Sequence, residues 1–193
     1  MFLESQINHP MQKGSIEVIC GSMFSGKTEE LLRRLKRAEI ANIKIAVFKP
    51  QVDARYDDKK VVSHNKNEML STPIKEAEEI LNLVNDAQVI AIDEAQFFNT
   101  NLIDVCNTLA NKGKRIIIAG LDMDFLGKPF GVMPQLLAIA EHVTKVHAIC
   151  IDCGAIANHS FRTTPDIELV KIGEKKEYKA LCRNCFTTNN LKD

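Results

Sequence analysis

The sequence predicts an α/β fold, in which a parallel sheet carries helices on both faces and is followed by a smaller C-terminal domain. Apolar, β-branched runs alternate along the chain with segments of helical periodicity. These runs are continuously apolar, as expected for parallel strands that are covered on both faces. From about residue 150 onward the chain becomes polar and is punctuated by cysteines. These three observations define the fold class.

The elements of the sheet follow in chain order. Ser-Ile-Glu-Val-Ile-Cys at 15–20 forms the first expected strand, and the helix after it carries Leu31, Leu32 and Leu35 on one face. Expected strands are 15–20, 43–48, 88–92, 115–120 and 143–149, and expected helices are 29–40, 75–84 and 102–110. Antiparallel strands are expected at 167–172 and 178–181, and regular structure is expected least at 1–13, 50–66, 121–133 and the last few residues.

The change in character near residue 149 divides the chain. The 193 residues, of which 45% are hydrophobic, are enough to bury a substantial core. We expect a flexible N-terminus at 1–14, an α/β domain at 15–149, a small cysteine-containing domain at 150–186 and a flexible tail at 187–193.

The charge balance argues against binding to polyanions. The chain has 25 basic and 25 acidic residues, so no global field recruits nucleic acid or an anionic membrane, although a local basic patch remains possible. The sequence has no run of about 18 apolar residues that would span a bilayer and no basic, apolar leader at its start. We expect a cytoplasmic protein that binds neither nucleic acid nor membranes.

A phosphate-binding loop follows the first strand. Its Gly-x-x-x-x-Gly-Lys-Thr pattern lets backbone N–H groups at a helix N-terminus converge on phosphate oxygens. The lysine would reach the β- and γ-phosphates of a nucleoside triphosphate, and the threonine hydroxyl would ligate Mg²⁺. The alternative is an unliganded turn. The motif makes the expected domain P-loop NTPase-like and consists of Gly21, Ser22, Met23, Phe24, Ser25, Gly26, Lys27 and Thr28.

Two carboxylates end the third strand. Asp93 and Glu94 follow Val-Ile-Ala-Ile, the form of the second P-loop element that supports Mg²⁺. Asp93 fits the magnesium role, while Glu94 could orient or deprotonate an attacking hydroxyl or water. The alternative is that both carboxylates only solvate the end of a strand.

Four cysteines have metal-ligand spacing. Two C-x-x-C pairs separated by 28 residues could present four thiolates to one tetrahedral Zn²⁺, and the closed ligand shell indicates a structural site. The alternatives are two redox dithiols or four core thiols. The pairs are Cys150 with Cys153 and Cys182 with Cys185, whereas Cys20 and Cys106 are expected to be buried in a strand and a helix.

A long connection follows the fourth strand. Residues 121–131 carry Phe125 and Phe130 beside glycines, after the carboxyl end of a strand. Such aromatics are either satellite core or the walls of a site for a flat ring, because ligand sites of α/β proteins form at this edge.

Taken together, these motifs closely resemble the type II (cellular-type) thymidine kinase family. The resemblance rests on Gly-Ser-Met-Phe-Ser-Gly-Lys-Thr, Ile-Asp-Glu-Ala-Gln-Phe-Phe, Leu-Asp-Met-Asp-Phe with Lys-Pro-Phe-Gly, and the paired C-x-x-C motifs, and it covers about residues 15–186. It implies transfer of the γ-phosphate of ATP to the 5′-hydroxyl of thymidine or deoxyuridine. It also implies a homotetramer, structural Zn²⁺, Mg²⁺ with ATP, and dTTP as a feedback inhibitor.

The resemblance assigns catalytic and donor-site roles. Glu94 corresponds to the family's general base, and Asp53-Ala54-Arg55-Tyr56 resembles a segment whose arginine, here Arg55, approaches the transferring phosphate. With Lys27 these form the expected catalytic set. The ATP and magnesium contacts are then expected from the phosphate loop and from Asp53, Asp93, Glu94, Ala95 and Gln96. Ala95 stands where animal members often have glycine. Alanine would be unfavourable there if the position required a positive φ.

The resemblance also implies a pocket for the base. Side chains expected around the thymine are Met23, Phe97, Leu121, Phe125, Phe130 and Tyr178. Residues 169–173 match a lasso-type loop that binds the base through main-chain groups, and the expected contacts there are Val170, Lys171, Ile172 and Gly173. Zn²⁺ would hold this loop in place, because a small zinc-ribbon-like domain with little core depends on such a cross-link.

Two rival functions remain from the sequence. A zinc-ribbon P-loop ATPase that acts on nucleic acid would explain two of the four motifs, but the chain is too short for two motor domains and no Arg/Lys cluster with interleaved aromatics is present. A kinase for another deoxynucleoside, such as deoxycytidine, would use the same main-chain contacts to the base.

Overall fold

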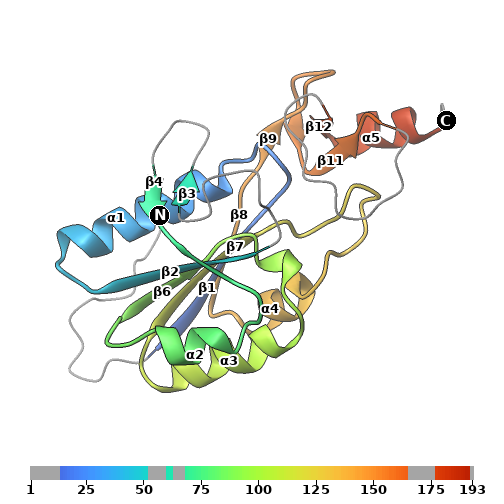
Figure 1. Ribbon diagram of the computed structural model, residues 1–193. Coiled ribbons are helices and arrows are strands. Elements are labelled where there is room, and N and C mark those ends of the chain that lie inside the picture. The colour runs from blue at the N-terminus through green and yellow to red at the C-terminus, as the bar shows by residue number, and fades with distance from the viewer. Residues whose placement is uncertain (1–13, 52–59, 63–67, 165–176, 192–193) are drawn as a thin grey trace.

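The computed structural model describes residues 14–51, 60–62, 68–164 and 177–191 and is built around a six-stranded parallel sheet (Figure 1). The strands lie in the order β5-β2-β6-β7-β1-β8, and every neighbouring pair is parallel. The sheet confirms the predicted α/β class. Its strands are β1 (Ser15–Cys20), β2 (Ile45–Pro50), β5 (Thr72–Ile74), β6 (Val89–Ile92), β7 (Arg115–Gly120) and β8 (His142–Lys145).

Helices cover both faces of this sheet (Figure 1). Helix α1 (Lys27–Ile40) lies on one face, while α2 (Glu79–Leu83), α3 (Asn101–Asn111) and α4 (Met133–Ile139) lie on the other. The central strand β7 shows why its run is continuously apolar: Ile117 packs in the cluster with α1, while Ile116 and Ile118 pack in the cluster with α3. Because successive strand residues point to opposite faces, a sheet covered on both sides needs an apolar residue at every position.

The structure corrects the expected elements at several places. The helix expected at 75–84 is confined to α2, and α4 was not predicted. The strand expected at 143–149 is wrong as one element, because β8 ends at Lys145 and β9 (Ala148–Ile149) pairs outside the large sheet. The break occurs where the Val146 N–H donates to the Cys20 carbonyl, after which the chain leaves the sheet. A short antiparallel pair was not predicted: β3 (Lys60–Val62) lies in the segment 50–66 that was expected to be irregular, and β4 (Glu68–Leu70) follows that segment.

The chain after β8 forms small antiparallel pairs and a helix. Strand β9 pairs with β10 (Ile156–Ala157), and β11 (His159–Arg162) pairs with β12 (Tyr178–Leu181), which confirms the strand expected at 178–181. The other expected strand, 167–172, lies outside the described residues. Helix α5 (Arg183–Asn190) was not predicted and includes the first residues of the segment expected to be a flexible tail. The division into domains stays a prediction.

Among the residues that the structure describes, no helix has both the length and the apolar character needed to cross a membrane.

Candidate functional site

The phosphate-binding loop connects β1 to α1 as the motif predicts. Gly21 has a φ of 149°, and a Cβ there would lie 2.2 Å from the Val146 carbonyl oxygen, so only glycine fits. Gly26 caps α1 with a φ of 85°. Phe24, between them, has a φ of 63° and therefore holds a conformation that is uncommon for a non-glycine residue. The loop backbone is thus fixed by local sterics before any ligand binds.

Lys27 folds back over this loop. Its side chain is 9% exposed, and Nζ donates to the Ser22 carbonyl oxygen at 2.8 Å. Burial lowers the pKa of Lys27, while the negative charges of Glu94 and Asp93 oppose that shift. The Ser22 hydroxyl oxygen is buried and has no hydrogen-bond partner among the described residues. The loop therefore holds the Lys27 amine and an unpaired hydroxyl, which suit a hydrogen-bonding, anionic ligand.

The acidic pair lies at the end of β6. Asp93 is buried, and its Oδ1 accepts from the Glu94 N–H at 3.0 Å. Burial, followed by the charge of Glu94, raises the pKa of Asp93 to about 7, and the Thr28 hydroxyl donates a hydrogen bond to it. The structure thus brings the two expected magnesium residues, Thr28 and Asp93, into contact. Their hard oxygen donors fit Mg²⁺, whose charge would also favour the ionised carboxylate.

Gln96 holds the Glu94 side chain. Gln96 is buried, its Nε2 donates to Glu94 Oε2 at 2.6 Å, and its Oε1 accepts from the Leu121 N–H at 2.9 Å. Leu121 follows β7, so one amide side chain connects the ends of two neighbouring strands. The positive φ in this segment, 53°, belongs to Glu94, whereas Ala95 begins a 3₁₀ turn, Ala95–Phe97. Alanine is therefore unstrained at the position that often carries glycine in the resembled family.

The predicted aromatic residues fall into two groups. The rings of Phe97 and Phe130 meet edge to face with centroids 5.7 Å apart. Phe125 and Tyr178 both contact the guanidinium of Arg162, which lies 3.8 Å from the Phe125 ring centroid. Met23 is half-buried in the phosphate loop. Whether these side chains surround a base stays a prediction.

Two residues of β11 were missed by sequence reasoning. The Met23 N–H donates to Ser160 Oγ at 2.9 Å, so β11 contacts the phosphate loop directly. Arg162 stands two residues further along the same strand, and hence on the same face. No motif marks either residue. The only available signal was the alternation of residues along the strand, which is weak because the strand is short.

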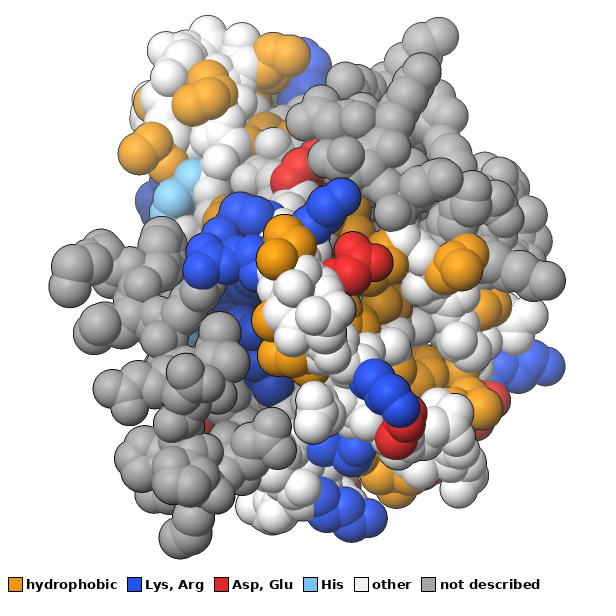
Figure 2. All heavy atoms as spheres, turned by 90° about the vertical axis from the view of Figure 1, so that its left-hand side faces the viewer, with side chains coloured by type: hydrophobic (Ala, Val, Ile, Leu, Met, Phe, Trp, Pro, Cys, Tyr) orange, Lys and Arg blue, Asp and Glu red, His pale blue; other side chains and the backbone are white. Residues whose placement is uncertain are grey.

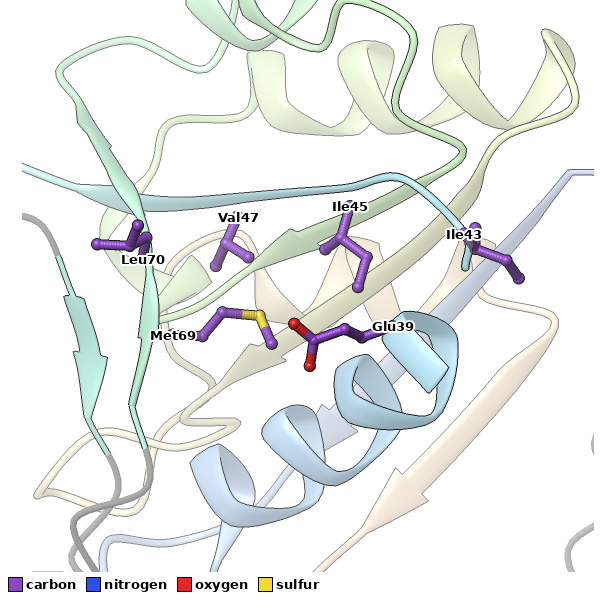
Figure 3. Close-up of a pocket in the computed structure, with 6 residues that line it drawn as sticks. All are labelled: Glu39, Ile43, Ile45, Val47, Met69 and Leu70. Carbon is purple, nitrogen blue, oxygen red and sulfur yellow. The ribbon is translucent and has the colours of Figure 1, made fainter. Parts of the chain in front are cut away.

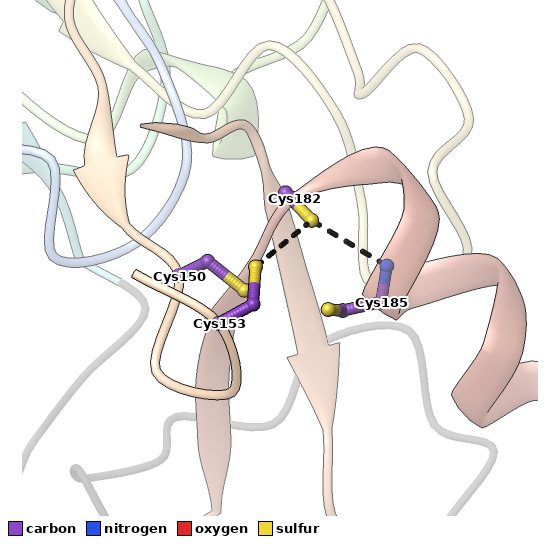
Figure 4. Close-up of side chains that lie close together, drawn as sticks. All are labelled: Cys150, Cys153, Cys182 and Cys185. Atoms are coloured by element: carbon purple, nitrogen blue, oxygen red, sulfur yellow. Dashed lines mark hydrogen bonds between the residues drawn. The ribbon is translucent and has the colours of Figure 1, made fainter. Parts of the chain in front are cut away.

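The four predicted cysteines converge at one point (Figure 4). Cys150 and Cys153 lie on the turn after β9, and Cys182 and Cys185 on the start of α5. Their Sγ atoms all lie within 4.8 Å of one another, with Cys153 and Cys182 3.6 Å apart. Four sulfurs at this spacing fit a tetrahedral Zn²⁺. Cys20 and Cys106 are buried elsewhere, as expected.

Some expected site residues lie outside the described residues. These are Asp53 and Arg55 in one segment, and Val170, Lys171, Ile172 and Gly173 in another. Their assignment therefore stays a prediction from the resemblance alone.

The face at the left of Figure 1 carries a separate cavity. Lys and Arg side chains gather near the middle of this face (Figure 2). The exposed basic residues of α1 are Arg33, Lys36 and Arg37. A pocket of about 300 Å³ lies between the end of α1, β2 and β4 (Figure 3). It is lined by Glu39, Ile43, Ile45, Val47, Met69 and Leu70, none of which belongs to the motifs above. We therefore place the candidate site at the phosphate loop and not in this pocket.

Comparison with known proteins gives a consistent family assignment. A family model described as thymidine kinase matches residues 14–186. A thymidine kinase of Bacteroides fragilis (strain YCH46) is 55% identical over 186 residues, which cover 96% of this chain and 94% of the relative. A thymidine kinase of Rhodothermus sp. (strain ITI 518) is 56% identical over 180 residues, covering 93% and 84%.

A solved structure resembles the fold at low identity. The flagellar accessory protein FlaH from Methanocaldococcus jannaschii superimposes with a TM-score of 0.52 at 14% identity, over 76% of each chain. This likeness concerns the fold alone.

Proposed function

Because the chain belongs to the thymidine kinase family, we propose that it transfers the γ-phosphate of ATP to the 5′-hydroxyl of thymidine, and of deoxyuridine. The products are ADP and the nucleoside monophosphate, as in pyrimidine deoxynucleotide salvage. The observation that carries the proposal is the convergence of the phosphate loop with Asp93 and Glu94 at one edge of the sheet, where the charges of both carboxylates act on Lys27. Ligand sites of open α/β sheets form at this edge.

The phosphate loop would hold the donor. Backbone N–H groups at the start of α1 would bind the β- and γ-phosphates, and Lys27 would exchange its bond to the Ser22 carbonyl for a phosphate oxygen. Mg²⁺, when bound, neutralises phosphate charge that develops during transfer. Thr28 and Asp93 would hold it, since they already contact each other. Arg55 would add a further positive charge near the transferring phosphate.

Glu94 would orient the acceptor. In the transfer, the 5′-oxygen forms a bond to the γ-phosphorus while the bond from that phosphorus to the bridging oxygen of ADP breaks. The proton of the 5′-hydroxyl passes to the Glu94 carboxylate, late in a loose transition state. Gln96 holds the Glu94 carboxylate through its 2.6 Å hydrogen bond. A carboxylate held in this way needs little reorganisation when the substrate binds.

The nucleoside base would lie among the aromatic side chains. We assign its walls to Phe97, Phe125, Phe130 and Tyr178, with Met23 from the phosphate loop and Leu121 beside them, and its polar edge to main-chain groups of residues 170–173. The four cysteines would hold a structural Zn²⁺ that anchors this part of the chain. Following the resemblance, we further propose a cytoplasmic homotetramer that is inhibited by dTTP.

A radiolabelled ATP assay against a panel of nucleosides tests the proposal. We expect label transfer to thymidine and deoxyuridine, with much less to deoxycytidine. Preferred transfer to another deoxynucleoside would reassign the acceptor. ATP hydrolysis that requires single-stranded DNA, without transfer to any nucleoside, would contradict the kinase.

Glu94→Gln tests the role of the carboxylate. The substitution keeps size and hydrogen bonding but removes the proton acceptor, so kcat should fall at least ~10²-fold with nearly unchanged ATP affinity. Asp104→Asn, which removes one negative charge from the exposed surface of α3 after the same strand, serves as a charge control and should keep wild-type turnover. Wild-type turnover of Glu94→Gln would remove Glu94 from the mechanism.

A further inference from the structure

A buried arginine joins two aromatic residues from distant parts of the chain. Arg162 lies on β11 and is only 6% exposed. Its guanidinium carbon lies 3.8 Å from the centroid of the Phe125 ring and 5.3 Å from that of Tyr178. Its Nη2 and Nε donate to the Tyr178 hydroxyl at 2.6 and 3.1 Å. A desolvated guanidinium that stacks on one ring and donates to another fixes both rings strongly.

The loop that carries Phe125 is itself rigid. Met123 and Pro129 form an isolated antiparallel bridge, and the buried Asp124 accepts from the N–H groups of Leu126 and Lys128, each at 2.9 Å. Gly127 closes the turn with a φ of 75°. The hydrogen bonds of this turn therefore position Phe125 against Arg162, and the contact needs no further ordering of the loop.

The same strand face reaches the phosphate loop. Ser160, two residues before Arg162, accepts from the Met23 N–H. Strand β11 thus contacts the phosphate loop through Ser160, the loop after β7 through Arg162, and β12 through its own hydrogen bonds. Arg162 occupies the place where the cysteine-bearing part of the chain is oriented against the loop after β7.

We propose that Arg162 is a positioning residue for the nucleoside base, because it sets the orientation of the Phe125 and Tyr178 rings. The inference rests on the proposed function, which places both rings at the base. Arginine is required because a planar guanidinium can stack on Phe125 while donating two hydrogen bonds to Tyr178, whereas lysine retains the charge but cannot do both. Loss of this geometry weakens nucleoside binding and leaves the phosphate loop, and so ATP binding, largely unchanged.

Steady-state kinetics of Arg162→Lys, Tyr178→Phe and the double variant test this role. Arg162→Lys should raise the KM for thymidine about tenfold, with kcat and the KM for ATP within about twofold of wild type. Tyr178→Phe keeps the ring and removes the acceptor, so the KM for thymidine should rise by a smaller factor, about threefold. The double variant should be no worse than Arg162→Lys, because both substitutions break one shared interaction. Arg183→Lys, an exposed arginine of the same region, should match wild type.

Zinc content and the melting temperature separate this role from a purely structural one. An unchanged KM for thymidine in Arg162→Lys, or an equal rise in both KM values with a lowered melting temperature, would overturn the proposal. If Arg162→Lys loses zinc or fails to fold, Tyr178→Phe decides alone: a selective rise in the KM for thymidine supports the proposal, and a wild-type value refutes it. Wild-type protein that phosphorylates a different nucleoside would contradict the proposed substrate, and the KM comparison then applies to that nucleoside.

Discussion

Two regions of the molecule are stabilised by different means. The sheet region, β1 to β8 with α1 to α4, buries two large apolar clusters, one on each face of the sheet. Among the described residues of the cysteine region, β9 to α5, one small apolar cluster is buried, and three of its six members are alanines. The members are Ala148, Cys150, Ala157, Ala180, Leu181 and Phe186. Burial of a large aliphatic side chain contributes about 1.5–3 kcal/mol, so the second cluster supplies little. The comparison indicates that the sheet region is stabilised by its core, whereas the cysteine region has too small a core and would depend on the cross-link that we propose for its four cysteines.

The two regions are nevertheless joined at the phosphate loop. Phe24 packs against the apolar cluster of the cysteine region, and the neighbouring Met23 N–H donates to Ser160. A Cβ on Gly127 would lie 3.3 Å from the Phe186 ring, so the loop after β7 also approaches α5 closely. Disorder in the cysteine region should therefore disturb the phosphate loop, where we propose that ATP binds, although the sheet itself would persist.

The largest expected effect is the loss of the metal. Cys182→Ser removes one of four sulfurs, and structural Zn²⁺ contributes on the order of 10 kcal/mol to the folding of small metal-dependent units. We expect lost zinc by elemental analysis and lost amide protection in β9 to α5, while β1, β6 and β7 remain protected. Thymidine phosphorylation should fall with the metal content.

Cys106→Ala provides the matched control. Cys106 is buried in α3 within the sheet region, so its truncation should lower the stability of the sheet without releasing zinc. Zinc retained in Cys182→Ser would refute the four-cysteine site. Uniform loss of protection throughout the chain would show that the two regions do not differ as argued.

The difference between the regions also explains what the sequence predicted well. In the sheet region the continuous apolar runs and the spacing of Leu31, Leu32 and Leu35 reflect burial on a regular element, so β1, α1 and β7 lie close to their expected bounds. In the cysteine region, the contacts join residues distant in sequence, and the four cysteines converge from two separate segments. Periodicity therefore gave no signal for β11 or α5.

The residues of the candidate site likewise fall into those that local motifs predicted and those that depend on long-range contacts. The phosphate loop and the Asp93-Glu94 pair are local motifs, since glycines and a strand end dictate their form, and the structure brings them together. Arg162 and Ser160 act across long sequence separations, and their residue types are common on any strand. Gln96 was expected at the donor site, but its bridge from Glu94 to Leu121 depends on strand order, which the sequence does not specify.

A smaller effect is expected from the buried ion pairs of the sheet region. Glu17 on β1 accepts from Arg34 Nη1 at 2.8 Å and from Arg115 Nε at 2.6 Å. Although burial alone raises the pKa of Glu17, the hydrogen bonds and charges of Arg115 and Arg34 hold it below the usual value. Glu17→Gln removes the buried carboxylate that Arg34 and Arg115 share, which should cost about 3 kcal/mol of stability at pH 7 in urea unfolding.

The pH dependence of the stability lost in Glu17→Gln provides a control for this prediction. Because the pKa of Glu17 is lowered in the folded state, the unfolded chain takes up the proton first as the pH falls. The stabilisation is present above the ordinary pKa of 4.5 and is lost as the pH drops through the lowered value. The stability difference between wild type and Glu17→Gln should therefore be constant from pH 6 to 8 and shrink below about pH 4. A difference that grows under acid would contradict the assignment.

The smallest effect is expected where the same kind of ion pair lies at the surface. Arg33 and Arg34 both donate to Glu30, at 2.7 and 2.8 Å, but the Arg33 side chain is 46% exposed and that of Arg34 only 7%. Water screens the Arg33 pair and its side chain loses conformational freedom in forming it, so Arg33→Ala should change the free energy of unfolding by no more than about 0.5 kcal/mol. Arg34→Ala also removes one of the two arginines that pair with the buried Glu17, so it should cost several times more in the same urea titration. Equal costs for the two neighbours would mean that burial does not set the strength of ion pairs in the sheet region.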